Sequence, residues 1–530
     1  MKQLFRDREI LSTLAVFTLV SVFIVGTFSF STFPWFLFWP AFIGSSIFIV
    51  TNPRVGLFSI ILLTMIWERF FTLQPLVLFE RTIKLYPLDI LLLVTGMSAI
   101  AHWLIERHHR KLVHDPYAHA PAMLRSFGAC EKLLVVFALF ATMYFFQSQV
   151  VGVHEPEVAF STFKNYSFYI LLTFLVLALV RTRDDFFRLI RTMLAGGVGI
   201  IAFIVLGFVR GEGLWTEFTP LSTEGVRYLA FPHAYYLMIV LLIAGNVWAH
   251  RLPGGAGSGS AGFHHPLRTL GIMGIQFIGI LGSLMRHLWI AFIAGTVVMI
   301  ATSSVIVKRQ FLRWGQILFG VTLLLLLIGG TMIVVFPASA PGNVIAHFLD
   351  PLLVRITSLG HVTEDLSALW RLKLWQTAFT RFWENPLLGI GFGQEITFDV
   401  RGYISTVRVR DLHNSLFGLL VQMGVVGFAL FVAIQTALIV GYLRCRKHLS
   451  STIRPFVDGA FAAYVAFVVA SDFQPYLETN ILNIFFWLLL GIIRVAPHLS
   501  EKPNIDWSHL RLQKHLRILE SMHRRGAMSP

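Results

Sequence analysis

Residues 414–440 read NSLFGLLVQMGVVGFALFVAIQTALIV, a stretch without any Asp, Glu, Lys or Arg. About 20 apolar residues are enough for a helix to cross the hydrocarbon core of a bilayer. The stretch therefore predicts a transmembrane helix. Further apolar runs predict other spans near residues 10–28, 34–50, 56–72, 87–105, 133–150, 167–181, 188–209, 229–249, 268–284, 287–306, 314–336, 456–473 and 480–496.

The composition of the whole chain excludes most other classes of protein. Of the 530 residues, 56% are hydrophobic and 13% are charged, whereas about 25% of a soluble domain is charged. The mean hydropathy is +0.71. A soluble enzyme, a secreted disulfide scaffold and a disordered chain are therefore excluded. The predicted fold class is all-α, a polytopic integral membrane protein with about 14 (12–14) transmembrane helices and a long periplasmic loop that carries helices.

The basic residues predict how the chain is oriented in the membrane. Cytoplasmic loops of membrane proteins are enriched in Lys and Arg, so the net charge of +15 needs no nucleic-acid partner, and we expect none. With both termini inside, most basic residues fall in cytoplasmic loops: Arg54, Arg107, Arg110, Lys111, Arg125, Lys132, Arg181, Arg183, Arg251, Lys308, Arg309, Arg313, Arg444, Arg446, Lys447 and Arg454. The exceptions outside are Arg227, Arg286 and the basic residues of the loop 337–413.

Five parts of the chain follow from these spans: an N-terminal helical array (1–210), central helices with outer-face arginines (211–336), a long periplasmic loop (337–413), C-terminal helices (414–498) and a basic cytoplasmic tail (499–530). Within the loop, Leu366, Leu369, Trp370 and Leu374 recur at helical spacing, which predicts an amphipathic helix capped by Thr363. Asn385-Pro386 should end it, because a residue before proline resists the α conformation.

Two other motifs are weak indications of ligand binding. Gly389, Gly391 and Gly393 follow no strand and lack the spacing of a nucleotide loop. Histidines 102, 108, 109, 114 and 119 have no Cys or carboxylate at ligand spacing, so no metal site is expected. Cys130 and Cys445 both fall in predicted cytoplasmic loops, and we expect no disulfide between them.

Four stretches together resemble the bacterial O-antigen ligase and O-antigen polymerase superfamily. The most specific begins Arg371-Leu-Lys-Leu-Trp375, continues through Asn385-Pro-Leu-Leu-Gly-Ile-Gly-Phe-Gly393 and ends at His413-Asn414. The other three are Arg227 ahead of Phe231-Pro232-His233, where the family has Asn in place of the histidine; Ser283-Leu-Met-Arg286; and Asn480 through Gly491 with Trp487. The resemblance covers residues 220–495.

This resemblance implies a role in bacterial glycan assembly. The superfamily attaches or polymerises glycans carried on undecaprenyl diphosphate, is related to the C-type glycosyltransferases, and works without a metal ion or other cofactor. The implied partners are an undecaprenyl-diphosphate-linked glycan as donor, another glycan or lipid A-core as acceptor, and the surrounding lipid bilayer. The implied location is the bacterial inner membrane, with cytoplasmic termini and a periplasmic active site.

The outside arginines suit a reaction that breaks a sugar–diphosphate bond. The guanidinium group donates bidentate hydrogen bonds to phosphate and stays charged when partly buried. We therefore expect Arg227, Arg286 and Arg371 to hold the diphosphate. Each also has a structural interpretation: a snorkelling helix anchor for Arg227, a lipid-headgroup contact for Arg286, and stacking on Trp375 for Arg371.

His413 is the candidate general base. Histidine accepts a proton near neutral pH without special tuning, and this one directly precedes a span beside Asp411, which could orient the imidazole. Asn414 and Trp375 are supporting residues. Alternatively, His413 bonds to backbone while Asn414 caps the helix. Asp472 and Glu478 are further candidate bases or arginine partners.

Several functions remain open on sequence alone. Attack opposite the leaving group would make the enzyme an inverting glycosyltransferase, but the acceptor could be lipid A-core, another lipid-linked chain, or a protein serine or threonine. The main alternative class is a transporter or flippase of lipid-linked or anionic substrates, which would show paired interrupted helices and charges near mid-membrane. A purely structural membrane scaffold would leave the outside arginines unexplained.

Overall fold

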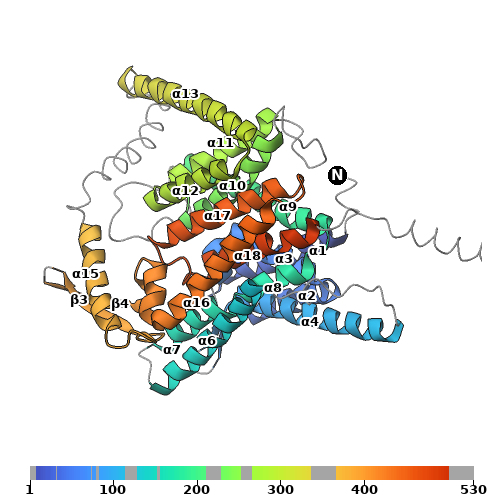
Figure 1. The fold of residues 1–530 in the computed structure, drawn as a ribbon, viewed down its shortest axis with the longest axis vertical. Coiled ribbons are helices and arrows are strands. Elements are labelled where there is room, and N and C mark those ends of the chain that lie inside the picture. The colour runs from blue at the N-terminus through green and yellow to red at the C-terminus, as the bar shows by residue number, and fades with distance from the viewer. Residues whose placement is uncertain are drawn as a thin grey trace, which may run out of the picture.

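The computed structural model describes residues 8–30, 33–72, 75–78, 83–113, 128–151, 155–210, 228–251, 266–335, 366–400 and 402–500 (Figure 1). Its helices are α1 (Arg8–Thr27), α2 (Trp35–Thr51), α3 (Pro53–Trp67), η2 (Glu68–Thr72), α4 (Pro87–Val113), α6 (Ala129–Val151), α7 (Pro156–Phe163), η3 (Lys164–Phe168), α8 (Leu171–Leu179), α9 (Arg183–Arg210), α10 (Phe231–Arg251), α11 (Pro266–Gly282), α12 (Arg286–Thr302), α13 (Val305–Val335), α15 (Leu366–Phe382), η5 (Val409–Asp411), α16 (Ser415–Arg446), α17 (Arg454–Ser471) and α18 (Asn480–Ser500). The strands are β1 (Leu76–Leu78), β2 (Ile83–Leu85), β3 (Glu395–Val400) and β4 (Tyr403–Arg408), which form two antiparallel hairpins, β1–β2 and β3–β4.

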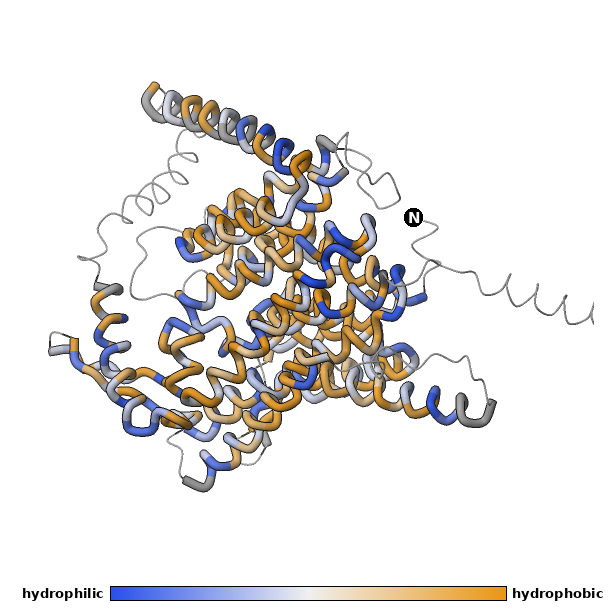
Figure 2. The backbone as a smooth tube through the Cα atoms, in the orientation of Figure 1, coloured by the Kyte–Doolittle hydropathy of each residue, from blue (hydrophilic) through white to orange (hydrophobic). Residues whose placement is uncertain are grey.

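The helices confirm a polytopic membrane protein. Ten helical segments in the described part of the chain are long and apolar enough to cross a membrane, and α2, α12 and residues 268–282 of α11 are shorter apolar helices. Each predicted apolar stretch overlaps a helix. The stretch 314–336, for example, overlaps the second part of α13. How many of these helices cross the membrane stays a prediction. Figure 2 shows hydrophobic residues along the bundle and hydrophilic residues gathered toward helix ends.

Several sequence predictions lie outside the described residues. They concern Arg227, the Thr363 helix cap, the first part of the long loop (337–365) and the basic tail beyond residue 500. The predicted span 167–181 is described and differs from the prediction. Its helical segment begins at Pro156 and contains η3, a π-helical turn in which Lys164 and Asn165 are buried.

Helices α10, α17 and α18 form the centre of the bundle. In the most apolar 18 residues of α10, 94% of the residues are buried, whereas the corresponding value for α1, at the periphery, is 33%. Helix α17 packs between α10 and α12, and α18 packs against α8. Gly459 permits the close approach of α17 to α10, since a Cβ there would lie 2.7 Å from the Cα of Ile243. Small residues play this role wherever membrane helices pack backbone to backbone.

Helix α16 is interrupted at Gly424, and a turn of the preceding loop forms hydrogen bonds with the backbone there. Gly424 has φ 64° and ψ −170°, a conformation essentially restricted to glycine. The N–H groups of Ile390 and Gly391 donate to the carbonyls of Val421 and Gln422 at 3.0 and 3.1 Å. In return, the N–H groups at positions 425 and 426 donate to the carbonyls at 386 and 387, at 2.9 and 3.2 Å. The turn 386–391 therefore replaces the helical hydrogen bonds that α16 lacks.

The described part of the long loop forms a small folded cap next to the first turns of α16 (Figure 1). Helix α15 ends before Asn385-Pro386, as predicted. The expectation of helices alone was incomplete, because residues 395–400 and 403–408 form the β3–β4 hairpin, with Gly402 at φ 83° just before β4. Ile396 and Phe398 of β3 pack with Leu374, Ala378 and Phe382 of α15 in a separate apolar cluster. The same cluster includes Val409, Leu412 and Val421.

We predict that Gly424→Ala destabilises the protein by about 1–3 kcal/mol, because alanine is strained at this φ and ψ. Its Cβ would also lie 2.2 Å from the carbonyl oxygen of Leu387. Thermal unfolding in detergent measures the effect. Gly271→Ala in α11 is the matched control, since a Cβ there meets nothing within 4 Å. Equal melting temperatures for the two variants would contradict the account of the turn.

Candidate active site

The linker 472–479 between α17 and α18 connects the parts of the candidate site. Gln474, Tyr476 and Glu478, at alternate positions, each bond to a different part of the chain. Their partners come from the start of α16, the start of α12 and the π-helical turn η3. The mouths of several helices are therefore fixed to one another by side chains of one short segment.

His413 lies between η5 and α16 in a strained backbone conformation. Its φ is 53°, and positive φ is uncommon for any residue other than glycine. Its Nδ1 lies 2.9 Å from Oε1 of Gln474. Because an amide oxygen only accepts hydrogen bonds, Nδ1 carries the proton and Nε2 of the neutral ring has the free lone pair. The imidazole packs edge-on with the ring of Trp370 of α15, with ring centroids 5.6 Å apart and an interplanar angle of 76°.

The surroundings keep His413 neutral near pH 7. Burial lowers the pKa of His413 below its ordinary value, and the positive charge of Arg371 lowers it further. The hydrogen bond to Gln474 and the negative charge of Asp411 oppose the shift in pKa. A neutral imidazole with a free Nε2 can accept a proton from a hydroxyl group.

The three predicted supporting residues have different roles from one another. The carboxylate of Asp411 does not orient the imidazole: it lies 3.5 Å from Nε of Arg410, and Gln474 takes the predicted position. Asn414 caps α16, since its Oδ1 accepts from the N–H of Phe417 at 2.9 Å. Trp375 donates from Nε1 to the carbonyl of Leu412 at 2.8 Å, which holds the backbone beside His413.

Glu478 is a buried carboxyl group at the centre of the linker contacts. Ser415, the first residue of α16, donates from Oγ to Oε2 at 2.6 Å, and Tyr166 of η3 donates to Oε1 at 2.7 Å. Burial raises the pKa of Glu478 from 4.5 to about 7, although both hydrogen bonds lower it. Glu478 therefore titrates near neutral pH, where it can take up or release a proton.

Arg286 is the first residue of α12, directly after a tight turn. Leu284 in this turn has φ 54°. The next residue, His287, lies with Nε2 2.8 Å from the hydroxyl of Tyr476, so the start of α12 is tied to the linker. The N–H of Tyr228 donates to the carbonyl of Gly282 at 3.0 Å, so Tyr228 lies at the same turn as Arg286.

A cavity of about 330 Å³ opens beside the linker. Arg69 of η2 and Arg410 of η5 contribute positive charge to its wall, and Glu68, Asp411 and Glu478 contribute carboxyl groups. Nη1 of Arg410 donates to Oγ of Ser161 at 2.9 Å. His413 follows Asp411 of the wall by two residues but is outside the lining. The cavity thus holds two arginines and three carboxyl groups, and its size would admit a small polar group.

Sequence reasoning did not find all the residues of this site. It named Glu478 and Asp472 only as alternatives and missed Gln474, Arg69 and Arg410. One signal was present, since Glu68-Arg69 stands at the end of an apolar stretch, and ionisable residues in such a place are functional candidates. In the described residues, no group of three or more His, Cys, Asp or Glu side chains is arranged to hold a metal ion.

Comparison with known protein families gives a match over part of the chain. The family model described as O-antigen ligase matches residues 271–432, a segment that includes Arg286, α15, the turn 386–391 and His413. No curated protein matches the chain. The resemblance read from the sequence is thus confirmed for the central and loop regions, while the linker 472–479 lies beyond the matched segment.

We predict that Glu478→Gln removes a pH dependence of stability. A carboxyl group whose pKa folding raises from 4.5 to about 7 stabilises the fold below pH 4.5, and this contribution is lost as the pH rises to about 7. Relative to the variant, the wild type should lose up to about 3 kcal/mol across this window. Thermal unfolding at a series of pH values measures the difference. A difference that stays constant between pH 5 and 7 would show that Glu478 does not titrate there.

Proposed function

We propose that this chain, which carries an O-antigen ligase domain over residues 271–432, transfers a glycan from an undecaprenyl-diphosphate-linked donor to an acceptor hydroxyl group. The family implies glycan transfer; the donor, the acceptor and the residue roles are our proposal. The observation that carries it is His413, whose backbone is strained and whose neutral imidazole lies near Arg371. Its Nδ1 is bonded to Gln474, which leaves Nε2 with the free lone pair. Such strain is typical of functional sites.

In the proposed reaction, Nε2 of His413 removes the proton of the acceptor hydroxyl. The oxygen attacks the anomeric carbon and forms the new glycosidic bond, while the bond from that carbon to the diphosphate oxygen breaks. The electron pair of the broken bond leaves with undecaprenyl diphosphate. Attack opposite the leaving group inverts the anomeric configuration. The protonated His413 then loses its proton to solvent or to Glu478, whose pKa of about 7 suits this exchange.

The diphosphate needs positive groups where its charge develops. Arg286 at the mouth of α12 and Arg371 on α15 have this role in our proposal, together with Arg227. Removal of a single donor to a developing anion typically lowers the rate by about 10²–10³. The cavity beside the linker adds Arg69 and Arg410, which extend the positive groups toward η2.

The distribution of basic loops supports a periplasmic site. At the end of the bundle away from His413, arginines pair with carboxylates: Arg446 with Asp458 at 2.9 Å and Arg494 with Glu131 at 2.7 Å. This end also holds many of the loops that are rich in Lys and Arg, and such loops face the cytoplasm in bacterial membrane proteins. The site at the linker 472–479 is then on the periplasmic side of the inner membrane.

We predict that His413→Ala lowers glycan transfer at least 10²-fold, because a general base typically contributes about 10²–10⁴. The assay uses proteoliposomes that contain the purified protein and an undecaprenyl-diphosphate oligosaccharide, with product size read on a gel. His448→Ala, an exposed histidine after α16, is the matched control and should keep full activity.

The same assay distinguishes the acceptors. A ladder without added acceptor identifies a polymerase, and transfer only after addition of lipid A-core identifies a ligase. Full activity of His413→Ala would contradict its proposed role. If the wild type is inactive with both acceptors, a protein acceptor or transport of the lipid-linked glycan becomes the better explanation.

We predict that Arg371→Gln shifts the acid limb of the pH–rate profile to higher pH. Transfer requires neutral His413, so the rate rises with pH through its pKa, and the charge of Arg371 keeps that pKa low. Lys373→Gln removes the same charge from an exposed position of α15 and should leave the profile in place. A lower rate with an unchanged profile would limit Arg371 to binding the donor.

A further inference from the structure

A second cavity, of about 1020 Å³, lies at the opposite end of the bundle from the candidate active site. Asn52 and Pro53, at the start of α3, line it, whereas η2 at the end of the same helical segment lines the first cavity. Residues 53–72 form one segment of 20 residues, which spans about 30 Å at 1.5 Å per residue. Asn52 and Pro53 of the second cavity are therefore separated from Thr72 of the first by about the thickness of a bilayer core.

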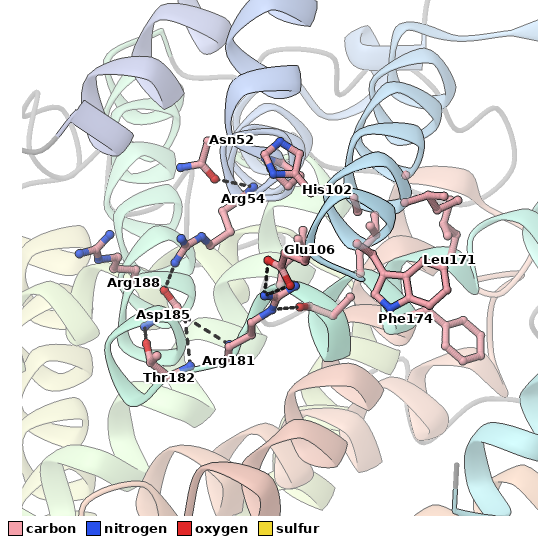
Figure 3. A pocket seen from close by; sticks show the side chains of 18 of the residues that line it. Asn52, Arg54, His102, Glu106, Leu171, Phe174, Arg181, Thr182, Asp185 and Arg188 are labelled. Atoms are coloured by element: carbon pink, nitrogen blue, oxygen red, sulfur yellow. Dashed lines mark hydrogen bonds and ion pairs between the residues drawn. The ribbon is translucent and has the colours of Figure 1, made fainter. Parts of the chain in front are cut away.

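One wall of the second cavity is apolar and belongs to α4 and α8. Leu171 and Phe174 of α8 face into it, as Figure 3 shows. Helix α4 contributes Gly96 and Ala99 to the same lining, and Gly96 packs closely against Leu171, since a Cβ there would lie 3.0 Å from Cδ2 of Leu171. Ile100, also in the lining, is 57% exposed. In a membrane this wall matches the chemistry of an acyl chain.

The other wall is charged, and its positive and negative groups balance. Three arginines (Arg54, Arg181 and Arg188) and three carboxylates (Glu106, Asp184 and Asp185) line it. Nη1 of Arg181 donates to both carboxylate oxygens of Glu106 at 2.7 and 2.9 Å. Arg54 pairs with Asp185, and Arg188 with Glu9. While they make these contacts, the three arginine side chains keep 36–38% of their surface exposed.

The charged wall is expected at the level of the lipid headgroups when the protein is in a membrane. Trp103 is part of the lining, and tryptophan is enriched at the membrane–water interface. His102, next to it, bonds through Nε2 to the carbonyl of Val50 at 2.8 Å. An acyl chain along α8 would thus place its headgroup among the arginines and carboxylates.

We propose that this cavity binds a phospholipid with a phosphoethanolamine headgroup. The phosphate accepts hydrogen bonds from the exposed edges of Arg54 and Arg188, and the ammonium group lies against the carboxylate of Asp184. A purely anionic headgroup would gain less, because the lining carries as many carboxylates as arginines. The inference is independent of glycan transfer, since it concerns the opposite end of the bundle.

Native mass spectrometry of the full chain in detergent tests this proposal. The delipidated protein is titrated with phosphatidylethanolamine and with phosphatidylglycerol of the same acyl chains. We expect one phosphatidylethanolamine per chain, bound at least five-fold more tightly than phosphatidylglycerol. Equal binding of the two lipids, or tighter binding of phosphatidylglycerol, would overturn the headgroup assignment.

Matched variants locate the bound lipid. Ala99→Trp fills the apolar part of the cavity and should weaken phosphatidylethanolamine binding about ten-fold or more. Met97→Trp adds the same side chain on α4 at an exposed position outside the lining and should leave binding unchanged. Equal binding by these two variants would remove the lipid from this cavity.

A second variant keeps the test decisive if Ala99→Trp does not fold. Asp184 is exposed at the start of α9, so Asp184→Asn removes its charge without opening a buried contact. We expect it to reduce the preference for phosphatidylethanolamine over phosphatidylglycerol at least three-fold. An unchanged preference would contradict the proposed contact with the ammonium group.

Discussion

Inside a bilayer, every backbone N–H and C=O group must be bonded within the protein. At Gly424, where α16 is interrupted, another segment of the chain provides these hydrogen bonds. The turn 386–391 supplies the missing donors and acceptors, so the loop that carries α15 is bonded directly into a central helix. Because α15 ends where the turn begins, its orientation follows from this exchange. That orientation brings Trp375 to the carbonyl of Leu412 and Trp370 to the ring of His413. A glycine deep in a helix thus determines the surroundings of a histidine at its mouth.

The linker 472–479 has a comparable effect on the membrane helices. Buried polar groups are costly unless they are bonded, and this linker bonds across large separations in sequence. Glu478 connects to Tyr166, 312 positions away, and Tyr476 connects to His287, 189 positions away. Loss of one partner would leave a buried polar atom unsatisfied. The helices α8, α12, α16 and α18 are therefore held in one arrangement at this end, which is the rigidity that a site needs to align a base with a phosphate group.

Local patterns in the sequence predicted much of the fold and only part of the site. Apolar runs located the helices, and Asn385-Pro386 correctly ended α15. The β3–β4 hairpin was missed although Ile396, Phe398 and Val400 alternate in the way that predicts a strand. Asp411 was assigned to the imidazole because it is close in sequence, whereas the actual partner, Gln474, is 61 positions away. No periodicity encodes such a pair. It arises only from the packing of α16 against α17 and α18, which places the linker beside the start of α16.

The conformation of His413 is difficult to explain by stability alone. A left-handed backbone costs about 1–2 kcal/mol for a residue with a side chain, and burial beside Arg371 makes the charged imidazole still less favourable. An asparagine or glycine at position 413 would adopt the same φ at lower cost and still precede the cap that Asn414 provides. Other residues compensate for the strain: Gln474 bonds the ring, and Trp375 holds the preceding carbonyl. Several side chains thus hold one strained, neutral histidine in place, and this supports the proposal that His413 acts as the base.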